Sequence, residues 1–192
     1  MGLTAGVSPN VAVLEGSGVE TGRGVLVDGR LRTSVPDVFS SGDCAEIRTD
    51  GEGRNVIQQV WYTGKKQGEF VASVIAGQDA HDYEPGIWFN SAKFLDLEYH
   101  TYGKVNLNVP GEKNLFWEHA SGKHAVRIVY TEEGVIGFDT IGLRWRHEVC
   151  ERWLRGRLSP REVIERIDEA SFEPELFRRH EPAIRRAFAG AV

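Results

Sequence analysis

The sequence predicts an α+β protein: a β-hairpin, a strand and a helix, followed by a small antiparallel sheet with C-terminal helices. Three observations predict this class. Short apolar runs bounded by turn residues recur over residues 24–39 and 92–138, which is the pattern of short strands. Apolar residues at helical spacing cover residues 56–77. The same helical period returns after Gly142.

Composition is that of an ordinary soluble globular protein. A chain of 192 residues suits one domain or two small ones, and its hydrophobic content is 41% against 27% charged residues. No apolar run is long enough to span a bilayer, and the N-terminus lacks the layout of a signal peptide. A net charge of -5 offers no general attraction for nucleic acid. We therefore expect a cytoplasmic protein that binds neither nucleic acid nor membrane.

The first two predicted strands are connected by a tight turn. Gly24–Val27 is apolar, and Asp28-Gly29 directly after it is a strong turn signal because glycine accepts positive φ freely. The chain then returns through Leu31 to Thr33, which predicts a hairpin. Pro36 prevents the second arm from being a central strand.

The stretch from Thr33 to Glu46 is the most informative part of the chain. Val38 and Phe39 predict a short strand, and Gly42-Asp43 follows it. Ligands of open α/β sheets lie at the carboxyl ends of strands, where Asp43 would accept a hydrogen bond from a sugar-like hydroxyl. The alternative is an ordinary turn from strand to loop.

A helix is predicted over residues 56–77, ended by Gly77 in a position suited to a C-cap. Gly64 and Gly68 leave a smooth stripe on it, either for a flat ligand or for tight packing on a sheet. Trp61 and Tyr62 either line a site or pack in the core.

A boundary is expected at about residues 78–86, which divides the chain into domains 1–80 and 87–192. In the second domain, strands are predicted over Ala92–Tyr99 and in three later runs. Glu132–Gly134 is the turn of an antiparallel hairpin. The three later runs are Leu115–Trp117, Ala125–Tyr130 and Val135–Phe138.

The last part is predicted to be helical. A helix with an apolar face from Trp145 to Leu154 ends at Gly156, and Ser159 begins a capping box with Glu162. The following apolar face is formed by Val163, Ile164 and Ile167. The stretch from Phe172 to Phe188 is predicted to form two short pieces, because Pro174 and Pro182 interrupt it.

Arginines cluster in the second domain, and two cysteines stand far apart in the chain. Five arginines form a basic cluster, which would suit an acidic electron carrier, but Glu148 and Glu151 between them favour an ordinary exposed helix face. Cys44 and Cys150 form no Cys-x-x-Cys pair, and His147 with Cys150 is too small a set for metal, so no metal or catalytic residue is predicted. The arginines are Arg144, Arg146, Arg152, Arg155 and Arg157.

The order Thr33, Val38, Phe39, Gly42, Asp43 resembles the second flavin-binding motif of the FAD-dependent pyridine nucleotide-disulfide oxidoreductases. Residues 6–10 resemble the segment by which these proteins return from the NAD(P)-binding domain to the FAD domain. The resemblance implies that residues 1–80 are the C-terminal part of an FAD-binding domain. It also implies that Asp43 binds a ribityl hydroxyl of FAD and that Gly42 leaves room for the cofactor.

In the family, the helix after this motif points its N-terminus at the flavin ring and stabilises negative charge there. The resemblance therefore places Ile57, Gln58 and Gln59 nearest the ring. It also implies that residues 87–192 are an interface domain of the rubredoxin-reductase-like or nitrite-reductase-like kind, which forms a homodimer.

Neither dinucleotide fingerprint of the family is present. Residues 16–21 have two of the glycines but lack the third, and they follow no clear strand. The FAD site is therefore expected to be incomplete, and NAD(P)H would be bound only by a missing domain.

Two functions remain open from the sequence. The chain is either a portion of an FAD-dependent NAD(P)H oxidoreductase, contributing the ribityl motif and the interface domain, or a non-catalytic dimerisation or partner-binding module derived from that family. The isolated chain is expected to be inactive. Its expected partners are a second copy or a complementing N-terminal chain, with an electron-acceptor protein as a further partner.

Overall fold

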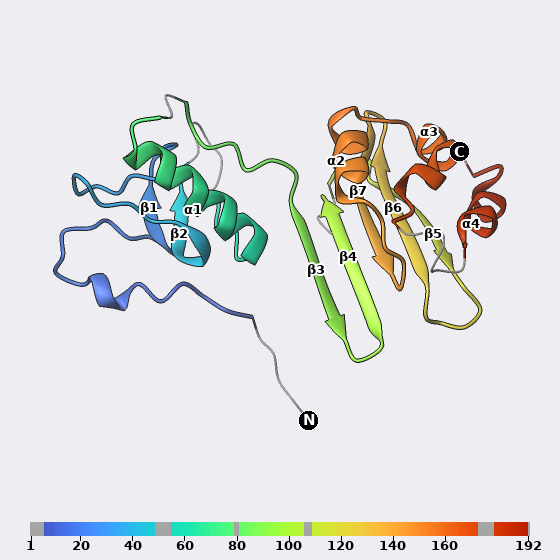
Figure 1. The fold of residues 1–192 in the computed structure, drawn as a ribbon, viewed down its shortest axis with the longest axis horizontal. Coiled ribbons are helices and arrows are strands. Elements are labelled where there is room, and N and C mark those ends of the chain that lie inside the picture. The colour runs from blue at the N-terminus through green and yellow to red at the C-terminus, as the bar shows by residue number, and fades with distance from the viewer. Residues whose placement is uncertain (1–5, 49–54, 79–80, 106–108, 173–178, 192) are drawn as a thin grey trace. The chain divides into compact units, whose positions relative to one another are not determined.

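A computed structural model of the chain describes residues 6–48, 55–78, 81–105, 109–172 and 179–191. The chain forms two compact units, Met1–Gly86 and Ile87–Val192, which are described one at a time. Figure 1 shows short strands and one long helix in the first unit, and a sheet with several helices in the second. The predicted α+β class is confirmed.

The first unit is built on two short parallel strands. β1 (Val25–Val27) pairs with β2 (Ala45–Ile47), with Val25 opposite Ala45. Two short 3-10 helices, η1 (Ala12–Leu14) and η2 (Gly42–Cys44), and the helix α1 (Trp61–Ile75) complete it. Phe70 and Val71 of α1 pack against a small core, which consists of Val25, Val27, Leu31 and Ala45.

The hairpin predicted from residue 24 to residue 33 is wrong in its pairing. The turn itself forms, since the Leu31 N–H donates to the Asp28 carbonyl at 3.0 Å. Leu31 then adopts a left-handed backbone (φ 58°) and is fully buried, so the chain turns away from β1 and Arg32 bridges Phe39. The partner of β1 comes instead from β2, later in the chain.

The strand predicted at Val38–Phe39 is also wrong. Phe39 makes only an isolated bridge, and Val38 is 39% exposed. Gly42 and Asp43 lie in η2, which leads directly into β2. Asp43 therefore precedes a strand and does not follow one, because the pairing with β1 selects residues 45–47 as the strand.

Helix α1 begins at Trp61, later than the predicted start at residue 56. Val56 instead exchanges hydrogen bonds with Ile47 at 2.9 and 3.0 Å, and Val60 has an extended backbone. The predicted end is confirmed. Gly77 has φ 70°, and its N–H donates to Val74, while Gln78 donates to Ser73.

The second unit is a five-stranded antiparallel sheet in the order β3-β4-β7-β6-β5. The small antiparallel sheet with C-terminal helices is therefore confirmed, and Figure 1 shows α2 lying over β4 and β7. The strands are β3 (Phe89–Phe94), β4 (Leu97–Gly103), β5 (Lys113–Glu118), β6 (Ala125–Thr131) and β7 (Gly134–Ile141). The helical elements are α2 (His147–Arg155), α3 (Pro160–Glu165), η3 (Ile167–Ala170) and α4 (Glu181–Phe188).

Residues 92–99 form two strands and not the single predicted one. Leu95 and Asp96 are the turn of a hairpin in which Phe94 pairs with Leu97. Leu95 adopts φ 53° and is 95% exposed, so an apolar residue occupies a turn position. The apolar pattern alone gave no sign of this turn.

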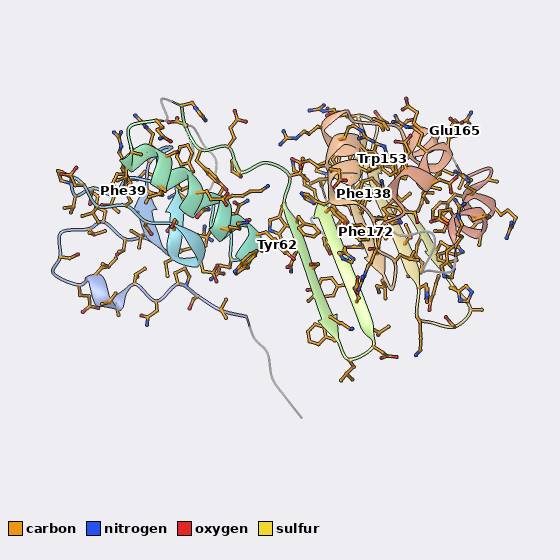
Figure 2. The ribbon with its side chains drawn as sticks, in the orientation of Figure 1. Phe39, Tyr62, Phe138, Trp153, Glu165 and Phe172 are labelled. Atoms are coloured by element: carbon orange, nitrogen blue, oxygen red, sulfur yellow. The ribbon has the colours of Figure 1, made fainter. Side chains whose placement is uncertain are left out.

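The core of the second unit lies between the sheet and its helices. Trp153 of α2 is fully buried and makes edge contacts with Phe138 of β7 and with Trp145. Figure 2 labels Phe138 and Trp153 close to each other in this unit. The Tyr102 hydroxyl donates to the Trp145 carbonyl at 2.9 Å, so a buried polar atom of the core is paired.

The C-terminal helices begin as capping rules require. The predicted capping box is present, with the Ser159 hydroxyl accepting the Glu162 N–H and the Glu162 carboxylate accepting the Ser159 N–H. Pro182 does not interrupt a helix; it lies in the first turn of α4, where its missing N–H costs nothing. Pro174 lies outside the described residues.

Replacing Ser159 by alanine is expected to lower the free energy of unfolding by about 1 kcal/mol, because the Glu162 N–H loses its capping acceptor and the Glu162 carboxylate loses the Ser159 hydroxyl. Urea unfolding of the full chain, followed by circular dichroism, measures the change. Arg186→Ala is the control, since Arg186 is exposed on α4. Equal effects of the two substitutions would contradict a specific role for the cap.

Candidate functional site

The Gly42–Asp43 turn packs directly against α1. The Gly42 N–H donates to the Gln67 side-chain oxygen at 2.6 Å, and Gln67 is 1% exposed. A Cβ atom on Gly64 would lie 3.4 Å from the Gly42 Cα, so the smooth face of the helix lets the turn approach closely. Gly64 therefore serves tight packing, whereas the space around a Cβ on Gly68 is open.

The outer side of this turn is open and carries a carboxylate. Gly42 adopts φ +78°, and a Cβ built on it would meet nothing within 4 Å. Asp43 is exposed, and its carboxylate makes no hydrogen bond or ion pair with the residues that the structure describes. The turn thus presents a hydrogen-bond acceptor beside an unfilled space.

The predicted ring-side residues lie ahead of α1 and not within its first turn. Ile57, Gln58 and Gln59 are half-buried in the segment that links the Val56 bridge to the helix, outside any helix or strand. The Gln58 side-chain oxygen is buried without a hydrogen-bond partner among the described residues. The N-terminus of α1 has no side-chain cap and no acidic residue in its first turn, so it favours negative charge nearby.

The structure adds Gln67 to the residues around the turn. Gln67 is a polar side chain at helical spacing among the apolar residues Val60, Val71 and Val74, and that misfit was the signal in the sequence. Trp61 is 71% exposed and meets Tyr62 edge-on at 5.4 Å, so the core alternative is wrong for Trp61. Figure 2 labels Tyr62 on this first turn of α1.

A buried carboxylate lies in β2. Glu46 is 4% exposed and accepts hydrogen bonds from the Gly24 N–H at 2.8 Å and the Asn55 amide at 3.2 Å. Arg23 lies 3.8 Å away. Burial alone would raise the pKa of Glu46, but these hydrogen bonds and the Arg23 charge outweigh it and lower the pKa. Glu46 therefore links Gly24, just before β1, to Asn55, which follows β2.

In the second unit, the arginine cluster is compensated locally. Arg144 makes a bidentate contact with Glu98 at 2.6 and 2.9 Å, and Arg146 donates to the Ser171 carbonyl. The structure thus supports the exposed-face interpretation over a free basic patch. The remaining pairs are Arg152 with Glu169, Arg155 with Glu151, and Arg157 with Glu133.

The cysteines occupy different environments. Cys44 is half-buried at the edge of the first core, whereas Cys150 is fully buried in the second unit, where burial raises the pKa of its thiol well above the usual range. Within the described residues, no three His, Cys, Asp or Glu side chains are arranged to hold a metal ion. In that same part of the chain, no helix is long and apolar enough to cross a membrane.

The fold and the turn define an α+β protein whose first unit carries a pattern found in a known family of redox proteins. Residues 2–68 match the family model described as pyridine nucleotide-disulphide oxidoreductase. The predicted resemblance is therefore confirmed, and the chain is related to part of these oxidoreductases.

Two curated relatives illustrate the similarity. The chain is 33% identical over 108 residues to the NAD(P)H coenzyme A polysulfide/persulfide reductase of Pyrococcus horikoshii, covering 55% of this chain and 23% of the relative. It is 28% identical over 82 residues to the rubredoxin-NAD(+) reductase of Acinetobacter baylyi, covering 43% of this chain and 19% of the relative. The chain thus spans less than a quarter of the length of either protein.

A solved structure shows the same fold over nearly the whole chain. An FAD-dependent pyridine nucleotide-disulphide oxidoreductase from Desulfovibrio vulgaris aligns with a TM-score of 0.64 at 20% identity. The match covers 98% of this chain and 48% of that protein. At this identity the likeness is one of fold.

Proposed function

We propose that this chain is a portion of an FAD-dependent NAD(P)H oxidoreductase, in which residues 1–80 contribute the ribityl-binding motif and residues 87–192 an interface domain. The observation that carries the proposal is the Gly42–Asp43 turn. It is open on its outer side, presents an exposed carboxylate, and is held against α1 by Gln67.

The residues present fit one part of FAD. The Asp43 carboxylate would accept a hydrogen bond from a ribityl hydroxyl, and Gly42 would leave room for the chain that carries it. Ile57, Gln58 and Gln59 would lie beside the ring, where the uncapped N-terminus of α1 favours negative charge. When bound, the flavin supplies the capacity to accept a hydride from NAD(P)H.

The residues present do not fit the rest of the cofactor. A pyrophosphate group is usually held by a glycine-rich loop at a helix N-terminus, and the sequence from Met1 to Val192 contains no such fingerprint. The proposed site therefore requires a complementing N-terminal segment, which would also supply the NAD(P)H-binding domain. The proposal includes a cytoplasmic location. It also includes an electron-acceptor protein as partner, which the name of the relative rubredoxin-NAD(+) reductase suggests.

The second candidate is a non-catalytic dimerisation or partner-binding module. One face of the sheet favours it, because the register places exposed apolar side chains on the same side of three strands. A contiguous exposed apolar surface of this kind is typical of a protein-protein contact. These side chains are Phe94 at 69%, Leu97 at 40% and Ile141 at 40% exposure.

Replacing Asp43 by alanine is expected to weaken FAD retention at least tenfold in a complex of this chain with its complementing segment, because a charge-assisted hydrogen bond is lost. Fluorescence titration with FAD measures the dissociation constant. Glu84→Ala, which also removes an exposed carboxylate from the first unit, is the control and should leave retention unchanged. Equal FAD retention by Asp43→Ala and the unsubstituted complex would remove Asp43 from this role.

The two candidate functions predict different absorption spectra and different states of assembly for the complemented chain. The oxidoreductase function requires that the complemented chain take up FAD and show a flavin absorption spectrum in the visible range. A complemented chain that stays colourless with excess FAD, yet forms a stable dimer in sedimentation experiments, would favour the non-catalytic module.

A further inference from the structure

The five-stranded sheet carries a hollow on the face that points away from its helices. Side chains alternate between the two faces of a strand, and Val126 and Ile128 of β6 point into the core that α2, α3 and α4 cover. Ala125 and Arg127 therefore lie on the other side, which is called the open face below. A cavity of about 260 Å³ lies there, and most of its lining residues belong to the open face.

A small residue lies in the middle of this hollow. Ala125 has the smallest side chain among the lining residues, and it is 7% exposed. Ile141 of β7 lies directly opposite it, at 40% exposure, and Phe116 of β5, on the other side of β6, is 61% exposed. A short side chain between two large apolar ones leaves a space suited to a flat ring.

The next row of side chains across the open face is polar. Thr101 of β4, Asp139 of β7 and Arg127 of β6 lie opposite one another and line the same hollow. The Thr101 hydroxyl donates to the Asp139 Oδ1 atom at 2.7 Å. The Oδ2 atom accepts no hydrogen bond from the described residues and lies 3.7 Å from the Arg127 Nη1 atom. One carboxylate oxygen at the hollow therefore keeps acceptor capacity.

Carboxylates outnumber cations around this row. The Glu112 Oε1 atom lies 3.6 Å from the Arg127 Nη2 atom, so one guanidinium faces the two carboxylates of Glu112 and Asp139. Glu118 is exposed and lies opposite Ala125, on the same face. His100 also lines the hollow, but burial lowers its pKa and favours the neutral ring. The excess of negative charge favours a cationic ligand.

We propose that the hollow binds a small planar aromatic cation of the amidinium class. Its ring would lie over Ala125 between Phe116 and Ile141, and an amidinium N–H would donate to the Asp139 Oδ2 atom. A charge-assisted hydrogen bond and the contact of a cation with an aromatic face both favour this ligand over a neutral or anionic one. The site needs neither flavin nor a complementing segment, so it is independent of the proposed function.

Titration of the ¹⁵N-labelled full chain with benzamidine, followed by NMR, tests this site. Benzamidine should shift the amide signals of Ala125, Arg127 and Asp139 in a saturable way, which gives a dissociation constant. Benzamide has nearly the same shape but no charge, and benzoate carries the opposite charge. Both are expected to bind at least fivefold more weakly, because neither forms a charge-assisted hydrogen bond with a carboxylate.

Two variants make the test specific. Asp139→Asn should weaken benzamidine binding at least fivefold, and Ala125→Leu should abolish it by filling the hollow. Glu165→Gln is the matched control, because Glu165 is an exposed carboxylate of α3, on the helix side of the sheet (Figure 2). If Ala125→Leu fails to fold, Asp139→Asn decides. Equal binding of benzamide, an unchanged dissociation constant in Asp139→Asn, or shifts that do not saturate would overturn the proposal.

Discussion

Replacing Trp153 by alanine is expected to destabilise the Ile87–Val192 unit by about 3–5 kcal/mol, a large share of the stability of an ordinary domain. Trp153 is fully buried, and its ring meets those of Phe138 and Trp145 at 6.1 and 6.4 Å. Truncation removes these contacts and leaves a cavity between α2 and β7. The remaining side chains can fill it only in part, because the core is held by a continuous sheet on one side.

Urea unfolding combined with hydrogen exchange of the β6 and β7 peptides assigns this loss to the second unit. Phe116→Ala is the control, because Phe116 is a large aromatic residue of the same sheet and is 61% exposed. Its loss is expected to cost less than about 1 kcal/mol. Similar midpoints for the two variants would show that Trp153 does not hold this core together.

Replacing Glu46 by alanine is expected to destabilise the first unit by about 1–3 kcal/mol, because the Gly24 N–H and the Asn55 amide lose their acceptor in a buried site. Acidification should act in the same direction. The pKa of Glu46 is lowered in the folded chain, so its contribution is present above the unfolded value of about 4.3 and is lost as pH falls through the folded value.

Exchange protection of β1 and β2 measures this effect between pH 7 and pH 3. Glu46→Gln is the matched variant, since the amide keeps one acceptor oxygen but does not titrate. The acid-induced loss should therefore be smaller in Glu46→Gln than in the unsubstituted chain. If both lose protection in parallel, other carboxylates cause the acid sensitivity of this unit.

The candidate site was predictable from sequence only in its local part. Gly42 and Asp43 stand together in one short motif, and the positive φ of Gly42 and the exposure of Asp43 follow from the turn itself. Gln67 belongs to the same site but lies 25 positions away, and nothing local says that its side chain binds the Gly42 N–H. A contact between distant residues depends on how α1 docks on the turn.

The sequence by itself determined the features whose energetics are local. The glycine stop of α1 at Gly77, the capping box at Ser159 and the β6–β7 hairpin each depend on residues within a few positions, and all three are confirmed. Propensity, turn chemistry and short-range hydrogen bonds are enough to specify them.

Only the tertiary structure decided which segments pair over long distances. β1 takes β2 as a parallel partner in place of its own hairpin arm, and the Ile47–Val56 bridge delays the start of α1. Ile57, Gln58 and Gln59 therefore lie ahead of the helix. These pairings depend on the burial of Leu31 and Glu46 and on the hydrogen bonds that buried polar groups require. Both conditions involve residues far apart in the chain, so no local sequence pattern predicts them.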